Sequence, residues 1–218
     1  STEVHFFEHE GFIKLNEESA NHYYTQAINT LLLMQQCSNS DPTLPLFDKA
    51  FMLKEMNLCP EWFLNKYLGL QLTAQEEQCL GSQLNWIADK VAKQALVFIH
   101  RDYHSRNLML INALENPALG VIDFQDAMRG PLCYDLVSLL KDCYISWPRE
   151  AVLGWVRYFY ERNALAQEQS LADFVQAFDL CGLQRHLKVL GVFSRLNLRD
   201  AKSAYLKDLP LTLNYVLD

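Results

Sequence analysis

With 218 residues, half of them hydrophobic and 12% aromatic, the chain can bury the core of one globular domain, which argues against general disorder. A formal net charge of −7 argues against nucleic acid as a partner, because nucleic-acid binders usually carry a basic excess. No apolar run approaches the roughly 20 residues of a membrane span, so we expect a soluble, cytoplasmic protein without a membrane partner.

Apolar residues follow helical spacing before residue 96. The clearest stripe runs from Leu80 to Ala95 over four turns, directly before the first predicted strand. We expect Trp62, like Trp155 further along, to be a core residue, since large aromatics at helical spacing are ordinarily buried. The earlier features are a helix over 27–35, a turn over 38–42, a helix over 51–58 and an interruption at Pro60 before 61–68.

The period of the sequence changes between residues 96 and 124. Short apolar runs over 96–99, 108–111 and 119–122 alternate with polar segments, which predicts short strands in a loop-rich region. Asn116-Pro117 predicts a turn between the last two strands.

Helical spacing returns after residue 133. Stripes over 134–140 and 152–159 predict two buried helices, and Ser170 to Asp173 is a capping box opening a third that contains Phe174, Phe178 and Cys181. A short helix is expected over 210–218. The whole is predicted to be a mainly helical α+β domain over 1–218, with a small β insert carrying the polar site.

The six cysteines are scattered and form no C-x-x-C pair, and the chain does not start like a signal peptide. We therefore expect reduced, mostly buried thiols. They are Cys37, Cys59, Cys79, Cys133, Cys143 and Cys181.

Two polar clusters each follow a predicted strand: His100 to Asn107, and Asp123 sixteen residues later. Phosphoryl transfer needs an acid oriented on the acceptor hydroxyl and ligands that hold magnesium against the phosphates. We assign Asp102 as the general base. Asn107 and Asp123 are assigned to the metal, because Mg²⁺ prefers hard oxygen ligands. ATP and Mg²⁺ are the expected cofactors.

The string His-Arg-Asp-x-x-x-x-Asn resembles the catalytic loop of protein kinases. His104 and the run Asp123-Phe124-Gln125-Asp126-Ala127 are more similar to the aminoglycoside phosphotransferase and choline kinase superfamily. Within it, segments 130–140 and 183–191 resemble bacterial kinases that phosphorylate the anomeric hydroxyl of N-acetylmuramate and N-acetylglucosamine in peptidoglycan recycling. The resemblance covers nearly the whole chain.

One departure from this superfamily concerns the amino-terminal lobe. Its members carry there a nucleotide-covering loop and a phosphate-binding lysine, yet this chain has eight glycines, no glycine-rich loop and no β-rich stretch before residue 100. It also begins at Ser1 without methionine. The chain therefore resembles a protein-kinase-like C-terminal lobe, a piece of a longer protein whose N-terminal lobe is the expected partner. We expect the isolated chain to bind ATP weakly and to be inactive.

Further residues near the predicted site are supporting or substrate-binding candidates. Asp135, at a helix start, is expected to brace the loop, and an acceptor carboxylate would favour a bidentate arginine. The supporting candidates are His100, His104, Arg106, Asp126 and Asp135, and the substrate candidates are Glu55, Arg129, Arg185, Arg195 and Arg199.

Three alternatives remain open. His100, Asp102 and His104, at alternating positions of an extended segment, would form with Asp123 the zinc set of a metal hydrolase. A kinase-like module that only binds its ligand is the second. Within the kinase interpretation, the acceptor is an amino sugar, an aminoglycoside, choline or another small hydroxyl compound.

Overall fold

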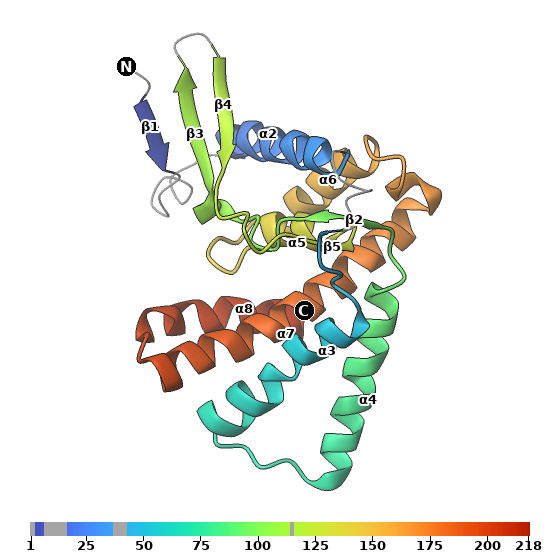
Figure 1. Cartoon of the computed structure of the whole chain (residues 1–218), viewed down its shortest axis with the longest axis vertical. Helices are drawn as coiled ribbons and strands as arrows, with labels where there is room; N and C mark the ends of the chain where they lie inside the picture. Colours follow the sequence, from blue (N-terminus) through green and yellow to red (C-terminus); the bar gives the residue numbers. More distant parts are fainter. Residues whose placement is uncertain (1–2, 7–16, 37–42, 114–115) are drawn as a thin grey trace.

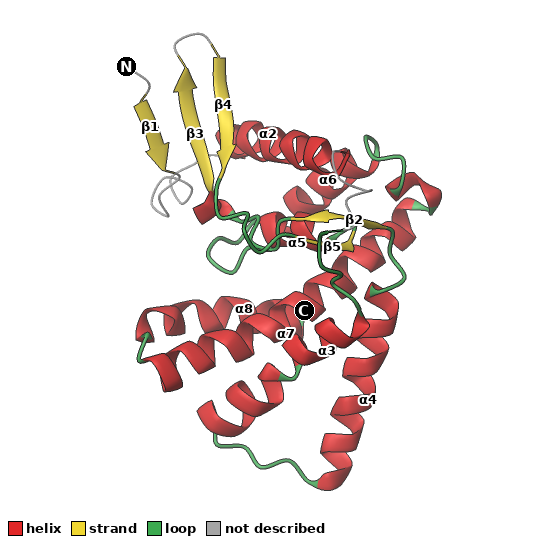
Figure 2. Cartoon of the chain, viewed as in Figure 1, coloured by secondary structure: helices red, strands yellow, loops and turns green. Residues whose placement is uncertain are grey.

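The computed structural model describes residues 3–6, 17–36, 43–113 and 116–218, and most of these are helical (Figure 1). The helices are α2 (Glu17–Gln36), α3 (Lys49–Met56), the π-helix η1 (Cys59–Tyr67), α4 (Ala74–Val91), α5 (Tyr134–Leu140), α6 (Arg149–Tyr160), α7 (Leu171–Asp200) and α8 (Leu209–Leu217), with short 3-10 helices η2 (Ser105–Asn107), η3 (Ala166–Glu168) and η4 (Ser203–Asp208). The strands are β1 (Glu3–Phe6), β2 (Leu96–Ile99), β3 (Leu108–Ala113), β4 (Asn116–Val121) and β5 (Met128–Pro131). The predicted mainly helical α+β class is confirmed (Figure 2).

The strands form two small antiparallel sheets, one in the order β1-β3-β4 and one pairing β2 with β5. The expected turn at Asn116-Pro117 is wrong, because both residues belong to β4, where they pair with Ala113 and Asn112. β4 lies at the edge of its sheet, and an edge strand tolerates proline because no ladder hydrogen bond is lost there. The turn expected over 38–42 lies outside the described residues.

α4 shows why its segment is helical. The Thr73 hydroxyl accepts a hydrogen bond from the Glu76 amide, while the Glu76 carboxylate accepts one from the Thr73 amide at 2.8 Å, which completes a capping box. The predicted stripe is confirmed, with Leu84, Ile87 and Val91 buried. The buried face of α4 fixes the helix that directly precedes β2 in the chain.

The break expected near Pro60 is displaced. α3 ends at Met56, and Pro60 lies in the first turn of η1, where a missing N–H leaves no intrahelical bond unmade. The core position expected of Trp62 is wrong: the residue is partly exposed and lies outside the buried core, with the Lys66 ammonium 3.5 Å from its ring centroid. Trp155 is buried, as predicted.

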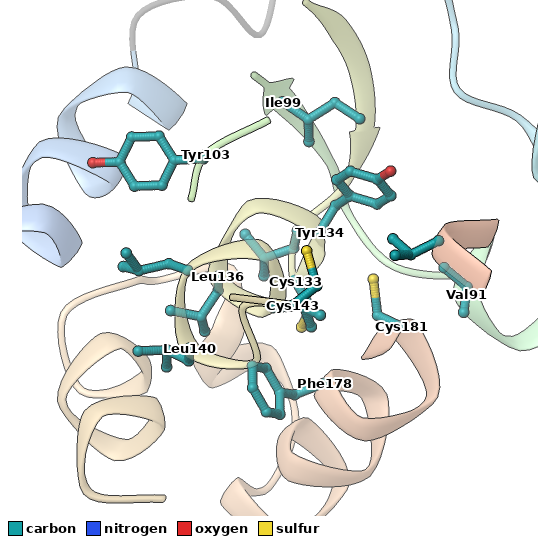
Figure 3. Close-up of a cluster of buried hydrophobic side chains, with 14 of the residues drawn as sticks. Val91, Ile99, Tyr103, Cys133, Tyr134, Leu136, Leu140, Cys143, Phe178 and Cys181 are labelled. Carbon is teal, nitrogen blue, oxygen red and sulfur yellow. The ribbon is translucent and has the colours of Figure 1, made fainter. Parts of the chain in front are cut away.

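α7 is the central helix of the helical part, packing against α3, η1, α4, α5, α6, η4 and α8 (Figure 1). Its N-cap is Ser170, whose hydroxyl accepts from the Asp173 amide at 3.1 Å, so the predicted start is confirmed. The core beside it contains buried Cys133, Cys143 and Cys181 (Figure 3). Among the described cysteines Cys59 is buried as well and Cys79 is exposed, which confirms mostly buried free thiols.

Gly191 of α7 packs directly against the backbone of Leu58, the residue before η1. A Cβ there would overlap the Leu58 carbonyl carbon and lie 2.5 Å from the Leu58 oxygen. We expect Gly191→Ala to lower the free energy of unfolding by about 1–3 kcal/mol, since the contact is with backbone that cannot rotate away.

Gly182, on the same helix, is the matched control. A Cβ there meets only Lys141 at 3.5 Å and Val137 at 3.7 Å, which are ordinary contacts. Urea unfolding should place Gly182→Ala at or above wild type, by up to about 1 kcal/mol, because alanine favours a helix over glycine. Equal effects of the two substitutions would contradict this account of the helix packing.

His186 lies in the core where α7 meets α8. Its Nε2–H donates to the Lys141 carbonyl at 2.9 Å, and its ring stacks on Tyr215. Burial, opposed by the hydrogen bond to Lys141, lowers the pKa of His186 from 6.5 to about 3. An unfolded histidine therefore takes up a proton first as the pH falls below about 6.5, so stability decreases between pH 6.5 and pH 3.

This histidine should contribute about 2 kcal/mol to a loss of stability between pH 7 and pH 5. We expect His186→Gln, whose amide retains a donor for Lys141 but does not titrate, to remove that component. Urea unfolding at both pH values, compared between wild type and variant, isolates it from other titrating groups. The same pH dependence in both proteins would contradict the assignment.

No helix within the described ranges is both long and apolar enough to cross a membrane.

Candidate active site

The residues from His100 to Asn107 connect β2 to β3, and Asp123 follows the end of β4. The expectation that both polar clusters come directly after strands is confirmed. The Ile122 N–H donates to the Asn107 carbonyl at 3.1 Å, so the segment carrying Asp123 leaves the sheet beside Asn107. Asp102 and Asp123 are both close enough to His100 to act electrostatically on its ring.

Two residues of this region adopt left-handed backbone conformations that disfavour non-glycine residues. Arg101 has φ of 76° and Asp123 has φ of 71°. Each such residue costs on the order of 1–3 kcal/mol and persists only where its surroundings hold it. Arg101 directly precedes the predicted base Asp102, and Asp123 is itself the predicted metal ligand. The strained backbone therefore lies at the two positions that direct these carboxylates.

Asn107 is tied to the backbone of the predicted base. Its Nδ2 donates to the Asp102 carbonyl at 3.0 Å, which leaves its Oδ1 directed away from that bond. The Asp123 carboxylate is exposed and accepts a hydrogen bond from Gln125 Nε2 at 2.9 Å. An amide oxygen and a carboxylate are hard donors of the kind that Mg²⁺ takes, with its remaining positions filled by water and phosphate.

Asp135, in the first turn of α5, holds the strained entry to the loop. Its fully buried carboxylate accepts from the His100 amide at 2.6 Å and from the Arg101 amide at 3.0 Å. Burial raises the pKa of Asp135 to about 7, while these two amide hydrogen bonds act in the opposite direction. The Asp135 side chain thus stabilises the left-handed backbone of Arg101 through its amide.

Asp142 holds the other end of the loop, although the sequence did not suggest it. Its buried carboxylate accepts from the Ser105 amide at 3.0 Å, from the Ser105 hydroxyl at 2.6 Å and from the Tyr144 amide at 3.0 Å. The loop therefore lies between two buried carboxylates that bind its backbone, with Asp102 between the two attachment points.

Several cations surround the Asp102 carboxylate. Burial acts to raise the pKa of Asp102, but the charges of Lys188, Arg185 and Arg101 outweigh it, so the pKa lies below its ordinary value. Asp102 is consequently ionised at neutral pH. An ionised carboxylate can accept a hydrogen bond, and then a proton, from an acceptor hydroxyl.

The supporting candidates within and after the loop have different environments. His100 is buried, with its ring edge toward Tyr103, and burial lowers its pKa. His104 packs edge-on against Tyr144, whose ring also carries the Arg106 guanidinium at 3.5 Å from the centroid. Asp126 is exposed.

Two of the substrate candidates are connected to the catalytic loop. Glu55, on α3, accepts from Arg101 Nη2 at 2.7 Å, and Lys188 Nζ lies 3.5 Å from the same oxygen. Arg185 is buried on α7, and its positive charge helps to lower the pKa of Asp102.

The other three arginines are not brought to the loop by any contact among the described residues. Arg199 is exposed and pairs with its neighbour Asp200 at 2.7 Å. Arg129 lies in β5 and Arg195 on α7, and the Nε of each is buried without a hydrogen-bond partner in the described part of the chain. Nothing in this arrangement favours them as ligands of the acceptor.

The geometry assumed for a zinc site is wrong. His100, Asp102 and His104 were expected on an extended segment, but Arg101 is left-handed and the His104 amide bonds back to the Asp102 carbonyl at 3.0 Å, so the chain turns. Among the described residues no group of three or more His, Cys, Asp or Glu side chains is placed to hold a metal ion.

Lys188 is the residue near Asp102 that sequence reasoning missed most clearly. It lies on α7 one turn after Arg185, and a lysine within a long apolar stretch was the available signal. Its Nζ is also 3.4 Å from the buried Tyr134 hydroxyl.

The fold, mainly helical with a polar loop between short strands, is shared with solved phosphotransferases and kinases that act on small molecules. The structure superposes on a GDP complex of an aminoglycoside 2′-phosphotransferase with a TM-score of 0.63 and 17% identity, covering 96% of this chain and 67% of that one. It matches the Plasmodium vivax ethanolamine kinase with a TM-score of 0.63 and 12% identity, covering 94% and 62%. At these identities the likeness concerns the fold alone.

The chain belongs to the phosphotransferase enzyme family, whose model matches residues 6–204. It is 41% identical over 194 residues to an N-acetylmuramate/N-acetylglucosamine kinase of Neisseria meningitidis, covering 88% of this chain and 57% of the relative. A protein of the same name from Pseudomonas putida is 38% identical over 205 residues, covering 93% and 59%. The chain therefore spans less than two thirds of the length of these relatives.

Proposed function

We propose that the full-length protein transfers a phosphoryl group from ATP to a hydroxyl of an amino sugar. The preferred acceptor is the anomeric hydroxyl of N-acetylmuramate or N-acetylglucosamine, in cytoplasmic peptidoglycan recycling. The observation that carries this proposal is the 41% identity to a relative named for both sugars, across 88% of the chain. The likeness to an aminoglycoside phosphotransferase rests on 17% identity and is a weaker guide to the acceptor.

The roles of the site residues follow from their positions. Asp102 orients the acceptor hydroxyl and takes its proton as the phosphoryl group is transferred, for which its lowered pKa provides the ionised form. Asn107 Oδ1 and the Asp123 carboxylate would hold Mg²⁺. When bound, the metal neutralises charge on the phosphate oxygens. Asp135, by binding the His100 and Arg101 amides, keeps the loop in the conformation that presents Asp102.

This chain supplies the acceptor and metal half of the site in our proposal. The nucleotide-covering half belongs to an N-terminal lobe of the same full-length protein, in keeping with the 57–59% of the curated relatives' length that the chain spans. The 218 residues alone should bind ATP weakly and release no ADP in the presence of the sugar. Sugar phosphorylation by the isolated chain would contradict this division of labour.

An acceptor screen of the full-length protein tests the proposed function. ADP release is measured with N-acetylmuramate, N-acetylglucosamine, kanamycin, choline and ethanolamine under identical conditions. We expect the two amino sugars to give the highest kcat/KM. A clear preference for kanamycin or choline would move the protein to another substrate class within its family, and zinc-dependent hydrolysis without any need for ATP would overturn the kinase assignment.

A further inference from the structure

Arg101 lies directly before the proposed base and needs external support. Its left-handed φ of 76° is unfavourable for an arginine, and only its amide is accounted for by Asp135. The rest of the support comes from its side chain. The guanidinium donates to Glu55 Oε1 at 2.7 Å and lies 5.3 Å from the centre of the Phe51 ring.

Glu55 is held by two cations at one oxygen. Arg101 Nη2 and Lys188 Nζ both approach Oε1, at 2.7 Å and 3.5 Å, and the three side chains are only 10–16% exposed. Its Oε2 is buried without a hydrogen-bond partner in the described residues. Because this oxygen is shielded from solvent, a soluble acceptor cannot reach it as it stands, which argues against the direct substrate contact first expected of Glu55.

Lys188 joins this network from α7. It comes from the middle of α7, and its Nζ lies 3.4 Å from the hydroxyl of Tyr134, the first residue of α5. The network therefore connects α3, the loop, α5 and α7 at one point. Breaking a buried ion pair leaves an uncompensated charge, so the members of such a network hold one another in place.

We propose that Glu55 and Lys188 are positioning residues, which clamp the Arg101 side chain and so hold Asp102 in its reactive direction. This Glu55–Lys188 clamp rests on the proposed function, since it concerns the same phosphoryl transfer. It touches neither the reacting hydroxyl nor the nucleotide. Its contribution should therefore appear in kcat and leave the KM for ATP unchanged.

The chain offers a closely matched control in Lys141. Its Nζ lies 2.9 Å from Asp179 Oδ1, that carboxylate is shared with Arg149, and the lysine side chain is 14% exposed against 15% for Lys188. Lys141 is thus a second, equally covered lysine that shares a carboxylate with an arginine, but within the described ranges its side chain contacts Asp179, Phe178 and Tyr215 and not the catalytic loop. Lys141→Met measures the cost of losing such a lysine as structure alone.

The kinetic test uses the full-length protein with whichever acceptor the wild type phosphorylates. We expect Lys188→Met and Glu55→Gln each to lower kcat by about 10- to 100-fold with the KM for ATP within about twofold. Lys188→Arg should recover most of the loss, and the double variant should be no worse than the poorer single one. Lys141→Met should keep kcat within about twofold. Equal kcat values for Lys188→Met and Lys141→Met would overturn the clamp.

A second readout does not depend on the reaction and separates failure of the clamp from failure of the proposed function. Amide hydrogen exchange across residues 99–107 should be faster in Glu55→Gln and Lys188→Met than in wild type, and unchanged in Lys141→Met. Unchanged exchange in both clamp variants would overturn the clamp even if the protein is a sugar kinase. Faster exchange in a protein that phosphorylates no acceptor would leave the clamp standing and remove the proposed function.

Discussion

Full-length protein with Asp102→Asn is expected to lose about 10²- to 10⁴-fold in kcat while binding Mg·ATP almost as tightly as wild type. The substitution keeps the size of the side chain and its position between the two anchored ends of the loop. It removes only the ionised carboxylate that the surrounding cations favour. The acceptor hydroxyl then has no group to take its proton.

Initial-rate kinetics and nucleotide titration together measure this effect. Asp89→Asn is a suitable control, because Asp89 is an exposed acid on α4 that pairs with Lys49, which is itself well exposed. It should be indistinguishable from wild type. Undiminished product formation by Asp102→Asn would remove Asp102 as the base.

A second large effect, with a different signature, is expected for Asp123→Asn. This carboxylate is the only acidic member of the proposed magnesium pair, and an amide in its place binds the ion far less strongly. Losing the metal's stabilisation of transition-state charge, worth several kcal/mol, should lower kcat/KM by at least about 10²-fold.

Nucleotide binding separates the two variants. Titration with and without Mg²⁺ should show that Asp123→Asn has lost the metal dependence of ATP affinity, while Asp102→Asn retains it. The substitution should preserve the fold, because asparagine also tolerates the left-handed backbone conformation of Asp123. Retained magnesium dependence in Asp123→Asn would exclude it as a metal ligand.

The elements near the site that could be predicted are those whose pattern is local. The strand that ends at Ile99 and the stripe of α4 are uninterrupted apolar patterns, and Ser170 caps α7 through a residue three positions away. Local patterns also account for the loop itself, since Asp102 and Asn107 are joined by a hydrogen bond across five residues. Such features depend on little beyond neighbouring side chains.

Features that depend on distant contacts could not be predicted in the same way. Arg101 meets Glu55 across 46 residues of sequence, and Ser105 meets Asp142 across 37. α7 continues to Asp200 through a stretch in which buried polar residues interrupt the apolar pattern, among them Gln184. The polar residues are buried because α7 is surrounded by other helices, which no local pattern expresses.

The wrong prediction for Trp62 has a local cause, the type of helix in which it lies. η1 is a π-helix, as the hydrogen bond from the Leu68 amide to the Phe63 carbonyl five residues earlier shows. Its wider turn shifts the buried face away from the positions that α-helical spacing predicts. Phe63 is buried, while Trp62 remains partly exposed.

The central claim is that Asp102, Asn107 and Asp123 form the acceptor and metal half of an amino-sugar kinase site. The most direct test is to incubate the full-length protein with Mg²⁺, ATP labelled in its terminal phosphate and N-acetylglucosamine, and to identify the labelled product. We predict a sugar phosphate labelled at the anomeric oxygen, formed by wild type and lost in Asp102→Asn. The same incubation is run with N-acetylmuramate. Label released only as inorganic phosphate, with no labelled sugar from either amino sugar, would contradict the account.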